Sequence, residues 1–157
     1  MSAPTWMLDR ANHDDIPQLV TLLELLFAIE QDFSADPERQ RAGLQGVIDS
    51  PLGHIAVARD AAGKAIAMCS AQLVMSTAEG RPSAWIEDVV VDPAHQSCGV
   101  GRAVLQAALD WAASHGASRA QLLADLDNAP ALAFYQHLGW QATRLGARRL
   151  ALTPLKA

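Results

Sequence analysis

The chain has 157 residues, of which 50% are hydrophobic and 18% charged, and its formal net charge is −5. This size and composition are typical of one domain of roughly 100–150 residues and exclude a multidomain assembly. No apolar run reaches the roughly 18 residues of a membrane span, and no basic leader precedes an apolar core, so we expect a cytoplasmic protein that binds no membrane. The negative net charge disfavours binding to the phosphate backbone of a nucleic acid, so we expect no nucleic-acid partner.

Taken in chain order, the sequence alternates between helical and strand patterns. Asn12 is a capping residue ahead of an acidic first turn, and the turn Asp60-Ala61-Ala62-Gly63 separates two apolar runs typical of an antiparallel hairpin. The predicted helices are residues 14–28, 37–48, 99–114 and 129–138; the predicted strands are residues 5–8, 54–59, 65–75, 84–91, 119–124, 140–143 and 147–152. This order predicts a single α/β or α+β domain, residues 1–157, built on one mixed sheet with helices on both faces.

Cysteine and histidine usage indicates no metal site. Cys69 and Cys98 are too few for a disulfide framework and form no zinc-binding motif, and the five histidines are scattered along the chain. We expect both thiols to be reduced and no metal to be bound.

The segment between the strand at 84–91 and the helix at 99–114 has the composition of an anion site. Gly99 and Gly101 stand at the start of the helix, where the absence of a Cβ lets backbone N–H groups approach an anion and the helix dipole favours negative charge. No Lys-Ser/Thr pair follows the second glycine, so it is not a Walker loop, and the third glycine of the dinucleotide motif is missing. The pattern predicts a pyrophosphate site, with an ordinary tight turn as the alternative.

Two separate motifs resemble the GNAT superfamily of N-acetyltransferases. The first is Gln96-x-x-Gly99-x-Gly101 after Val91-x-Pro93, similar to the acetyl-CoA loop of that family. The second is the stretch 128–140, Asn-Ala-Pro-Ala-Leu-Ala-Phe-Tyr-Gln-His-Leu-Gly-Trp, similar to its later signature. The resemblance implies a fold with splayed central strands, acetyl-CoA as cosubstrate and acetyl transfer to an amine. Homodimers are common in the family, so we expect a possible homodimer.

Carried over by position, the resemblance implies a set of cofactor-binding residues. Backbone N–H groups of the loop would hold the pyrophosphate, backbone groups of the preceding strand would pair with pantetheine, and an asparagine would contact the cofactor arm. Gln96 stands where the family often has arginine, so binding would lean on the backbone and Arg102. The residues are Val89, Val91, Gln96, Cys98, Gly99, Val100, Gly101, Arg102 and Asn128.

Two residues are predicted to move protons. Tyr135, the single tyrosine, matches the family position near the coenzyme sulfur, where a phenol can return a proton to the leaving thiolate. Glu87, in an Ile-Glu-Asp stretch similar to polyamine and glucosamine-phosphate acetyltransferases, would take the proton of the amine, directly or through a water. In a regular strand Glu87 and Asp88 face opposite ways, so only one would serve the same amine. The alternative is a carboxylate pair that orders neighbouring loops.

The charge distribution suggests the kind of acceptor. Residues 1–50 hold nine acidic residues against three arginines, and the segment between the first two helices commonly borders the acceptor site in the resembling family. We therefore predict a small cationic amine, contacted by Phe27, Glu30, Asp32 and Phe33. The alternatives are a peptide or protein N-terminal acetyltransferase and a noncatalytic acyl-CoA sensor of the same fold.

Overall fold

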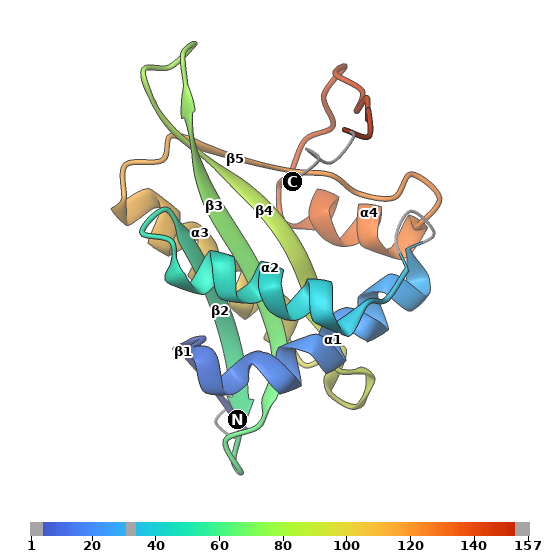
Figure 1. Ribbon diagram of the computed structural model, residues 1–157. Coiled ribbons are helices and arrows are strands. Elements are labelled where there is room, and N and C mark those ends of the chain that lie inside the picture. Colours follow the sequence, from blue (N-terminus) through green and yellow to red (C-terminus); the bar gives the residue numbers. More distant parts are fainter. Residues whose placement is uncertain (1–4, 31–33, 153–157) are drawn as a thin grey trace. The chain divides into compact units, whose positions relative to one another are not determined.

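The computed structural model describes residues 5–30 and 34–152 (Figure 1). Its strands are β1 (Trp6–Arg10), β2 (Gly53–Asp60), β3 (Ala65–Ser76), β4 (Arg81–Val91) and β5 (Arg119–Leu122). Its helices are α1 (Ile16–Ile29), α2 (Pro37–Asp49), α3 (Val100–Ser114) and α4 (Ala129–His137), with 3-10 turns at His13–Asp15 and Pro93–His95. The chain divides into two compact units, residues 1–122 and 123–157, and each is described by itself.

The first unit is a mixed sheet in the order β1-β2-β3-β4-β5. Neighbours from β1 to β4 are antiparallel, and β5 pairs with β4 in parallel. That parallel pairing joins residues 83–86 to residues 119–122, while β4 continues to Val91 without β5 beside it. The two strands therefore pair over only part of β4, which leaves the carboxyl end of β4 unpaired on the β5 side.

Helices cover both faces of this sheet. In Figure 1, α1 and α2 lie in front of it and α3 lies behind. On the α1 side a core of large side chains is fully buried, including Leu19, Ile55 and Met68. Alternate positions of β2 and β3, such as Ala56 and Ala67, are equally buried and face α3, and their small side chains allow the helix to approach. The expected mixed sheet with helices on both faces is confirmed.

The capping chemistry expected at residue 12 is also present. The Asn12 side chain accepts a hydrogen bond from the Asp14 N–H at 2.8 Å, and the Asn12 N–H donates one to Asp15 Oδ2 at 2.8 Å. This reciprocal capping box starts the first helical segment. Among the described residues no helix combines the length and apolar character needed to cross a bilayer.

The second unit contains α4 and an extended segment after it. The predicted strands at residues 140–143 and 147–152 are wrong, because the described part of this segment carries no strand and Leu145, Leu150 and Leu152 are more than 80% exposed. Thr143 is the one β-branched residue between positions 140 and 152, so local preference for a strand is weak and only a pairing partner would impose one.

Candidate active site

A β-bulge interrupts the pairing of β4 with β3. Glu87 stands opposite Ser70 and Val90 opposite Met68, so Asp88 and Val89 together face a single residue, Cys69. Asp88 takes a left-handed conformation with φ of 55°, which is uncommon for a residue other than glycine. The bulge bends β4 next to the point where β5 has left it.

The bulge corrects the expectation that the two carboxylates of β4 point to opposite faces. Glu87 shares a face with its cross-strand partner Ser70. The Ser70 hydroxyl also lies 3.3 Å from Asp88 Oδ2, so the Asp88 carboxylate lies on that side as well. The extra residue breaks strict alternation, and Glu87 and Asp88 therefore serve the same space.

The environment of Asp88 disfavours its charged form. Burial raises the pKa of this carboxyl to about 6, the negative charges of Glu87 and Glu30 contribute in the same direction, and the hydrogen bond from Ser70 opposes them. A carboxylate with a pKa near 6 is mostly charged at neutral pH and is a stronger base than an exposed aspartate. Perturbed carboxyls of this kind are typical of acid–base sites.

Glu87 has a more open setting. Its side chain is exposed and accepts a hydrogen bond from the Trp85 indole N–H at 2.5 Å. The indole orients the carboxylate on the same side of the sheet as Ser70. Glu87 is thus placed to meet an amine arriving from solvent.

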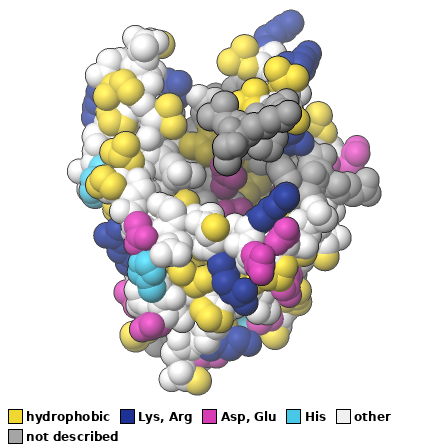
Figure 2. Space-filling view, viewed as in Figure 1, with side chains coloured by type: hydrophobic (Ala, Val, Ile, Leu, Met, Phe, Trp, Pro, Cys, Tyr) yellow, Lys and Arg dark blue, Asp and Glu magenta, His cyan; other side chains and the backbone are white. Residues whose placement is uncertain are grey.

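The predicted acceptor-binding residues do not all lie in the same place in the structure. Glu30 caps the C-terminus of α1, and its charge acts on Asp88, which joins it to the β4 carboxylates. Phe27 instead packs against the hydrophobic core beneath α1. Asp32 and Phe33 lie outside the described residues. Figure 2 shows acidic and basic side chains mixed over the face formed by α1 and α2.

The loop between β4 and α3 has the features of an anion site. Gly99 is the N-cap of α3 with φ of 83°, no side chain caps the helix, and a Cβ at this position would point into open space. Ser97 is also left-handed, with φ of 64°. The first N–H groups of α3, those of Val100, Gly101 and Arg102, precede the first intrahelical donor and point out of the helix start. These donors suit pyrophosphate oxygens.

The side chains of the loop make mostly local contacts. Gln96 Nε2 donates to the Val91 carbonyl at 3.5 Å, and the Cys98 thiol donates to the His95 carbonyl at 2.7 Å. Arg102 is exposed on the first turn of α3. Arg102 and the helix dipole both place positive charge at this helix start.

In the second unit, Asn128 and Tyr135 belong to α4. The Asn128 side-chain oxygen caps this helix by accepting the Ala131 N–H at 3.2 Å, so its amide nitrogen is the group left for a ligand. Tyr135 is half-buried, with edge-to-face contacts to Phe134 and Trp140 at centroid distances of 5.3 and 5.8 Å. These rings hold the phenol in one orientation.

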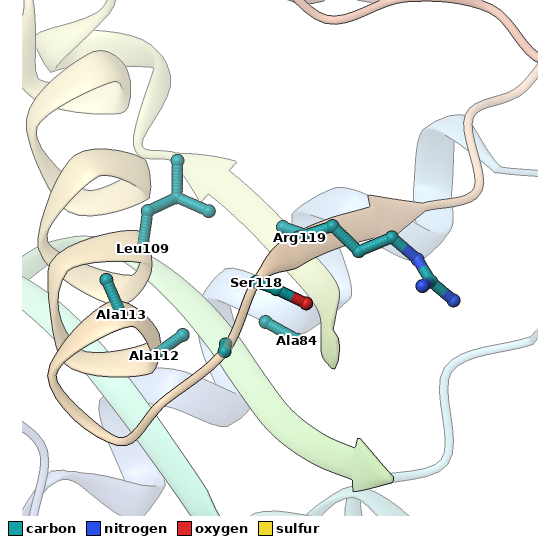
Figure 3. A pocket seen from close by; sticks show the side chains of 8 residues that line it. Ala84, Leu109, Ala112, Ala113, Ser118 and Arg119 are labelled. Carbon is teal, nitrogen blue, oxygen red and sulfur yellow. The ribbon is translucent and has the colours of Figure 1, made fainter. Parts of the chain in front are cut away.

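A cavity of about 200 Å³ opens on the other side of the sheet, between the end of α3 and β5. Figure 3 shows small side chains around it, with Arg119 directed away from its alanine walls. Its lining residues are Ala84, Leu109, Ala112, Ala113, Ala117, Ser118, Arg119 and Ala120. None of these lining residues carries a carboxylate, whereas the β4 bulge carries Glu87 and Asp88. Within residues 5–30 and 34–152, no three His, Cys, Asp or Glu side chains form a metal-binding group.

The mixed five-stranded sheet with helices on both faces is an acetyltransferase fold. The sequence matches the acetyltransferase (GNAT) family over residues 17–140, and the chain belongs to that family. It is an acetyl-transferring enzyme, and GNAT acetyltransferases use acetyl-CoA as cosubstrate. No curated protein matches the sequence.

Solved structures show the same fold. A protein assigned as an acetyltransferase from Agrobacterium tumefaciens is 27% identical, with a TM-score of 0.79 over 92% of this chain and 99% of that one. An aminoglycoside acetyltransferase from an uncultured soil metagenomic sample, solved with sisomicin, is 21% identical with a TM-score of 0.75, covering 96% and 97% of the two chains. Glucosamine-6-phosphate N-acetyltransferase from Arabidopsis thaliana is 20% identical with a TM-score of 0.75, covering 94% and 99%.

Sequence reasoning missed one residue of this site and undervalued another. Ser70 sits in the alanine-rich strand β3 and has no motif around it, so only the strand register reveals its contacts with the Asp88 carboxylate and the Glu87 carbonyl. Asp88 was visible as a second acid in an apolar strand, but a regular strand would have turned it away. The bulge that reverses this conclusion leaves no glycine or proline signal at residues 88 and 89.

Proposed function

We propose that this enzyme transfers the acetyl group of acetyl-CoA to the primary amine of a small cationic molecule by direct attack of the amine. The observation that carries the proposal is the β4 bulge, which puts Glu87 and Asp88 on one side of the sheet, where the charge of Glu30 also acts. An alkylammonium is attracted to such a cluster and must lose a proton before its nitrogen can react.

Each part of the β4–α3 segment has a role in this proposal. The N–H groups of residues 98–102 bind the pyrophosphate, with Gln96 and Arg102 at the edge of that site, and the backbone of Val89 and Val91 pairs with the pantetheine arm. When bound, acetyl-CoA supplies a thioester carbonyl that the amine can attack. Val89 lies in the bulge of β4, and its N–H is assigned to stabilise negative charge on that carbonyl oxygen.

The proton balance uses two further groups. A carboxylate of β4, Glu87 or Asp88, takes the proton of the amine as the new C–N bond forms. The C–S bond breaks, and the Tyr135 hydroxyl gives its proton to the departing sulfur, while Asn128 contacts the cofactor arm through its amide nitrogen. No covalent enzyme intermediate is required.

The experiment is a screen of diamines, polyamines, basic amino acids, aminosugars and N-terminal peptides for thiol release from acetyl-CoA. We expect a small cationic amine to give the highest kcat/KM. If none of the amines in the panel supports thiol release, acetyl transfer to a small amine is contradicted. If the best acceptor is a peptide or an anionic aminosugar, the cationic class is contradicted. The cytoplasmic location and the homodimer remain predictions of the same proposal.

Replacing Tyr135 by Phe tests the acid. Loss of the hydroxyl should lower kcat by roughly 10²–10⁴-fold, because proton donation to the leaving sulfur is lost while the ring packing is kept. The affinity for acetyl-CoA, measured by calorimetry, should stay within about twofold of wild type because the hydroxyl is assigned to the reaction and not to binding. A Tyr135→Phe enzyme with full turnover would show that water or another group protonates the sulfur.

A further inference from the structure

Ser70 is a buried hydroxyl placed between the two acidic residues of β4. It is 3% exposed, and its Oγ lies 3.0 Å from the Glu87 carbonyl oxygen and 3.3 Å from Asp88 Oδ2. A serine has one proton to donate, so the two oxygens share it or alternate. The hydroxyl therefore bridges the backbone before the bulge and the carboxylate within it.

The contact is built by the register of the strands. Ser70 stands directly opposite Glu87, and the next residue of β4 is the left-handed Asp88. A left-handed conformation is unfavourable for a residue with a side chain, so the surroundings must hold it. Ser70, on the adjacent strand β3, helps to hold this conformation because its hydroxyl bonds to both Glu87 and Asp88.

We infer that Ser70 is a positioning residue for acetyl transfer, whose hydroxyl holds the Asp88 carboxylate as the group that takes the proton from the acceptor amine. The inference rests on the proposed function and assigns the base within it. Asp88 is the better-placed of the two acids for this role, because Glu87 is exposed and its carboxylate is engaged by the Trp85 indole.

The groups around Asp88 explain why a single hydroxyl matters. Burial, Glu87 on β4 and Glu30 at the end of α1 all raise the pKa of Asp88, while Ser70 on β3 lowers it. The neighbouring thiol of Cys69 is fully buried, and burial raises its pKa to about 12, so it stays neutral. Ser70 thus acts against burial and two carboxylates, and its removal should leave Asp88 protonated over a wider range of pH.

The test is the pH dependence of kcat/KM for wild type, Ser70→Ala, Ser70→Thr and Ser83→Ala, with the best amine from the screen. The base must be charged to act, so the acidic limb of wild type should lie near pH 6. Loss of a hydrogen bond to a carboxylate should move that limb upward by about half to one pH unit in Ser70→Ala. Ser70→Thr, which keeps a hydroxyl, should restore it.

The matched control is Ser83, a buried serine of the same sheet. It lies five residues before Asp88 on β4, a distance of roughly 16 Å along a strand, so Ser83→Ala should leave the limb in place. A purely structural role of Ser70 would lower activity equally at all pH values. A carboxyl-carbon NMR titration of Asp88, which requires no turnover, should show the same upward shift in Ser70→Ala and none in Ser83→Ala.

Several results would overturn the inference. An active Ser70→Ala enzyme with the wild-type limb and an unshifted Asp88 titration would do so. If Ser70→Ala does not fold, Asp88→Asn and Glu87→Gln decide: the acidic limb should vanish in the first and persist in the second, and the reverse pattern makes Glu87 the base. A wild-type enzyme inactive towards every amine would instead remove the proposed function itself, and with it any base.

Discussion

At the scale of single residues, Asp15 is a buried carboxylate whose charge is balanced by an arginine. Its side chain is 7% exposed, and its two oxygens accept hydrogen bonds from Arg59 at 2.5 and 2.8 Å. Arg59 also bonds to Asp9 at 3.0 Å, which ties the first helical turn to the strands β1 and β2. The Arg59 hydrogen bonds hold the pKa of Asp15 below its usual value.

This pair predicts a pH-dependent part of the stability. Replacing Asp15 by Asn leaves the Arg59 charge without its buried partner and should lower the free energy of unfolding by about 3 kcal/mol at pH 7. A carboxyl with a lowered pKa stabilises the fold above its unfolded pKa of about 3.8, and this stabilisation disappears as the pH falls through the lower folded value. The difference between the two proteins should therefore shrink below pH 4.

Urea denaturation at pH 7 and pH 3 measures this difference. Asp110→Asn is the control, because Asp110 is exposed and its carboxylate accepts a hydrogen bond from Gln106 on its own helix; its effect should stay within about 0.5 kcal/mol. An Asp15→Asn effect that is equal at both pH values would show that lost packing, and not the charge, causes the destabilisation.

At the scale of elements, β4 begins earlier than the sequence predicts because its first residues pair with the end of β3, and contacts from β5 support that hairpin. The predicted strand starts at residue 84, whereas β4 starts at Arg81. Arg119 of β5 donates to Glu79 Oε1 at 2.8 Å and to Ser76 Oγ at 3.1 Å, and the Ser118 N–H donates to the Pro82 carbonyl at 3.0 Å. These bonds hold the tip of the β3–β4 hairpin against the start of β5, and no local pattern predicts them.

The β4–α3 loop carries the element-scale prediction. Gly99→Val should weaken CoA binding by about 2 kcal/mol or more, since a β-branched residue cannot easily adopt φ of 83° and the phosphate-facing N–H groups would turn. The space around Gly99 is open, so the fold should survive. Calorimetry with CoA measures the loss.

The control for backbone strain is Gly80→Val in the β3–β4 turn. Gly80 has φ of 65° and open space around it, so the substitution imposes similar strain away from the α3 start. Its CoA affinity should equal that of wild type. Equal affinity in Gly99→Val would remove this loop from the cofactor site.

At the scale of the whole molecule, the structure shows where one acidic residue of the N-terminal part of the chain exerts its charge. The acidic first third of the chain supplies Glu30, whose charge acts on the Asp88 carboxylate of β4. Glu30 and Asp88, which are far apart in the sequence, therefore both contribute negative charge to the same region of the molecule. Such a field would attract the cationic acceptor that we propose, and its strength depends on the salt concentration.

Glu30→Gln tests this field. Removing one charge should raise KM for the best cationic amine about fivefold at low salt, and the effect should fade at high salt because of screening. Since Glu30 raises the pKa of Asp88, the acidic limb of kcat/KM should also move to lower pH. Glu24→Gln, an exposed change earlier on α1, should alter neither. An unchanged KM in Glu30→Gln would contradict the acidic acceptor site.

The sequence by itself determined the helices, the hairpin, the glycine loop and the family. These features depend on short-range rules: apolar spacing sets helix and strand, Asn12 and Pro37 set helix starts, and the glycines of residues 99–101 set the loop. Each signal lies within a few residues of the structure it specifies. For the same reason the wrong predictions fell at residues 140–152, where strand formation needs a distant partner.

Only the tertiary structure decided which acids share a site. The bulge at Asp88 arises from how β4 pairs with β3, and the Ser70 contact joins residues 18 positions apart. The altered pKa of Asp88 then follows from burial and from Glu30, which is far away in the sequence. Strand register and burial are properties of the packed sheet, so the chemistry of these carboxylates could not be determined from their neighbours in the chain.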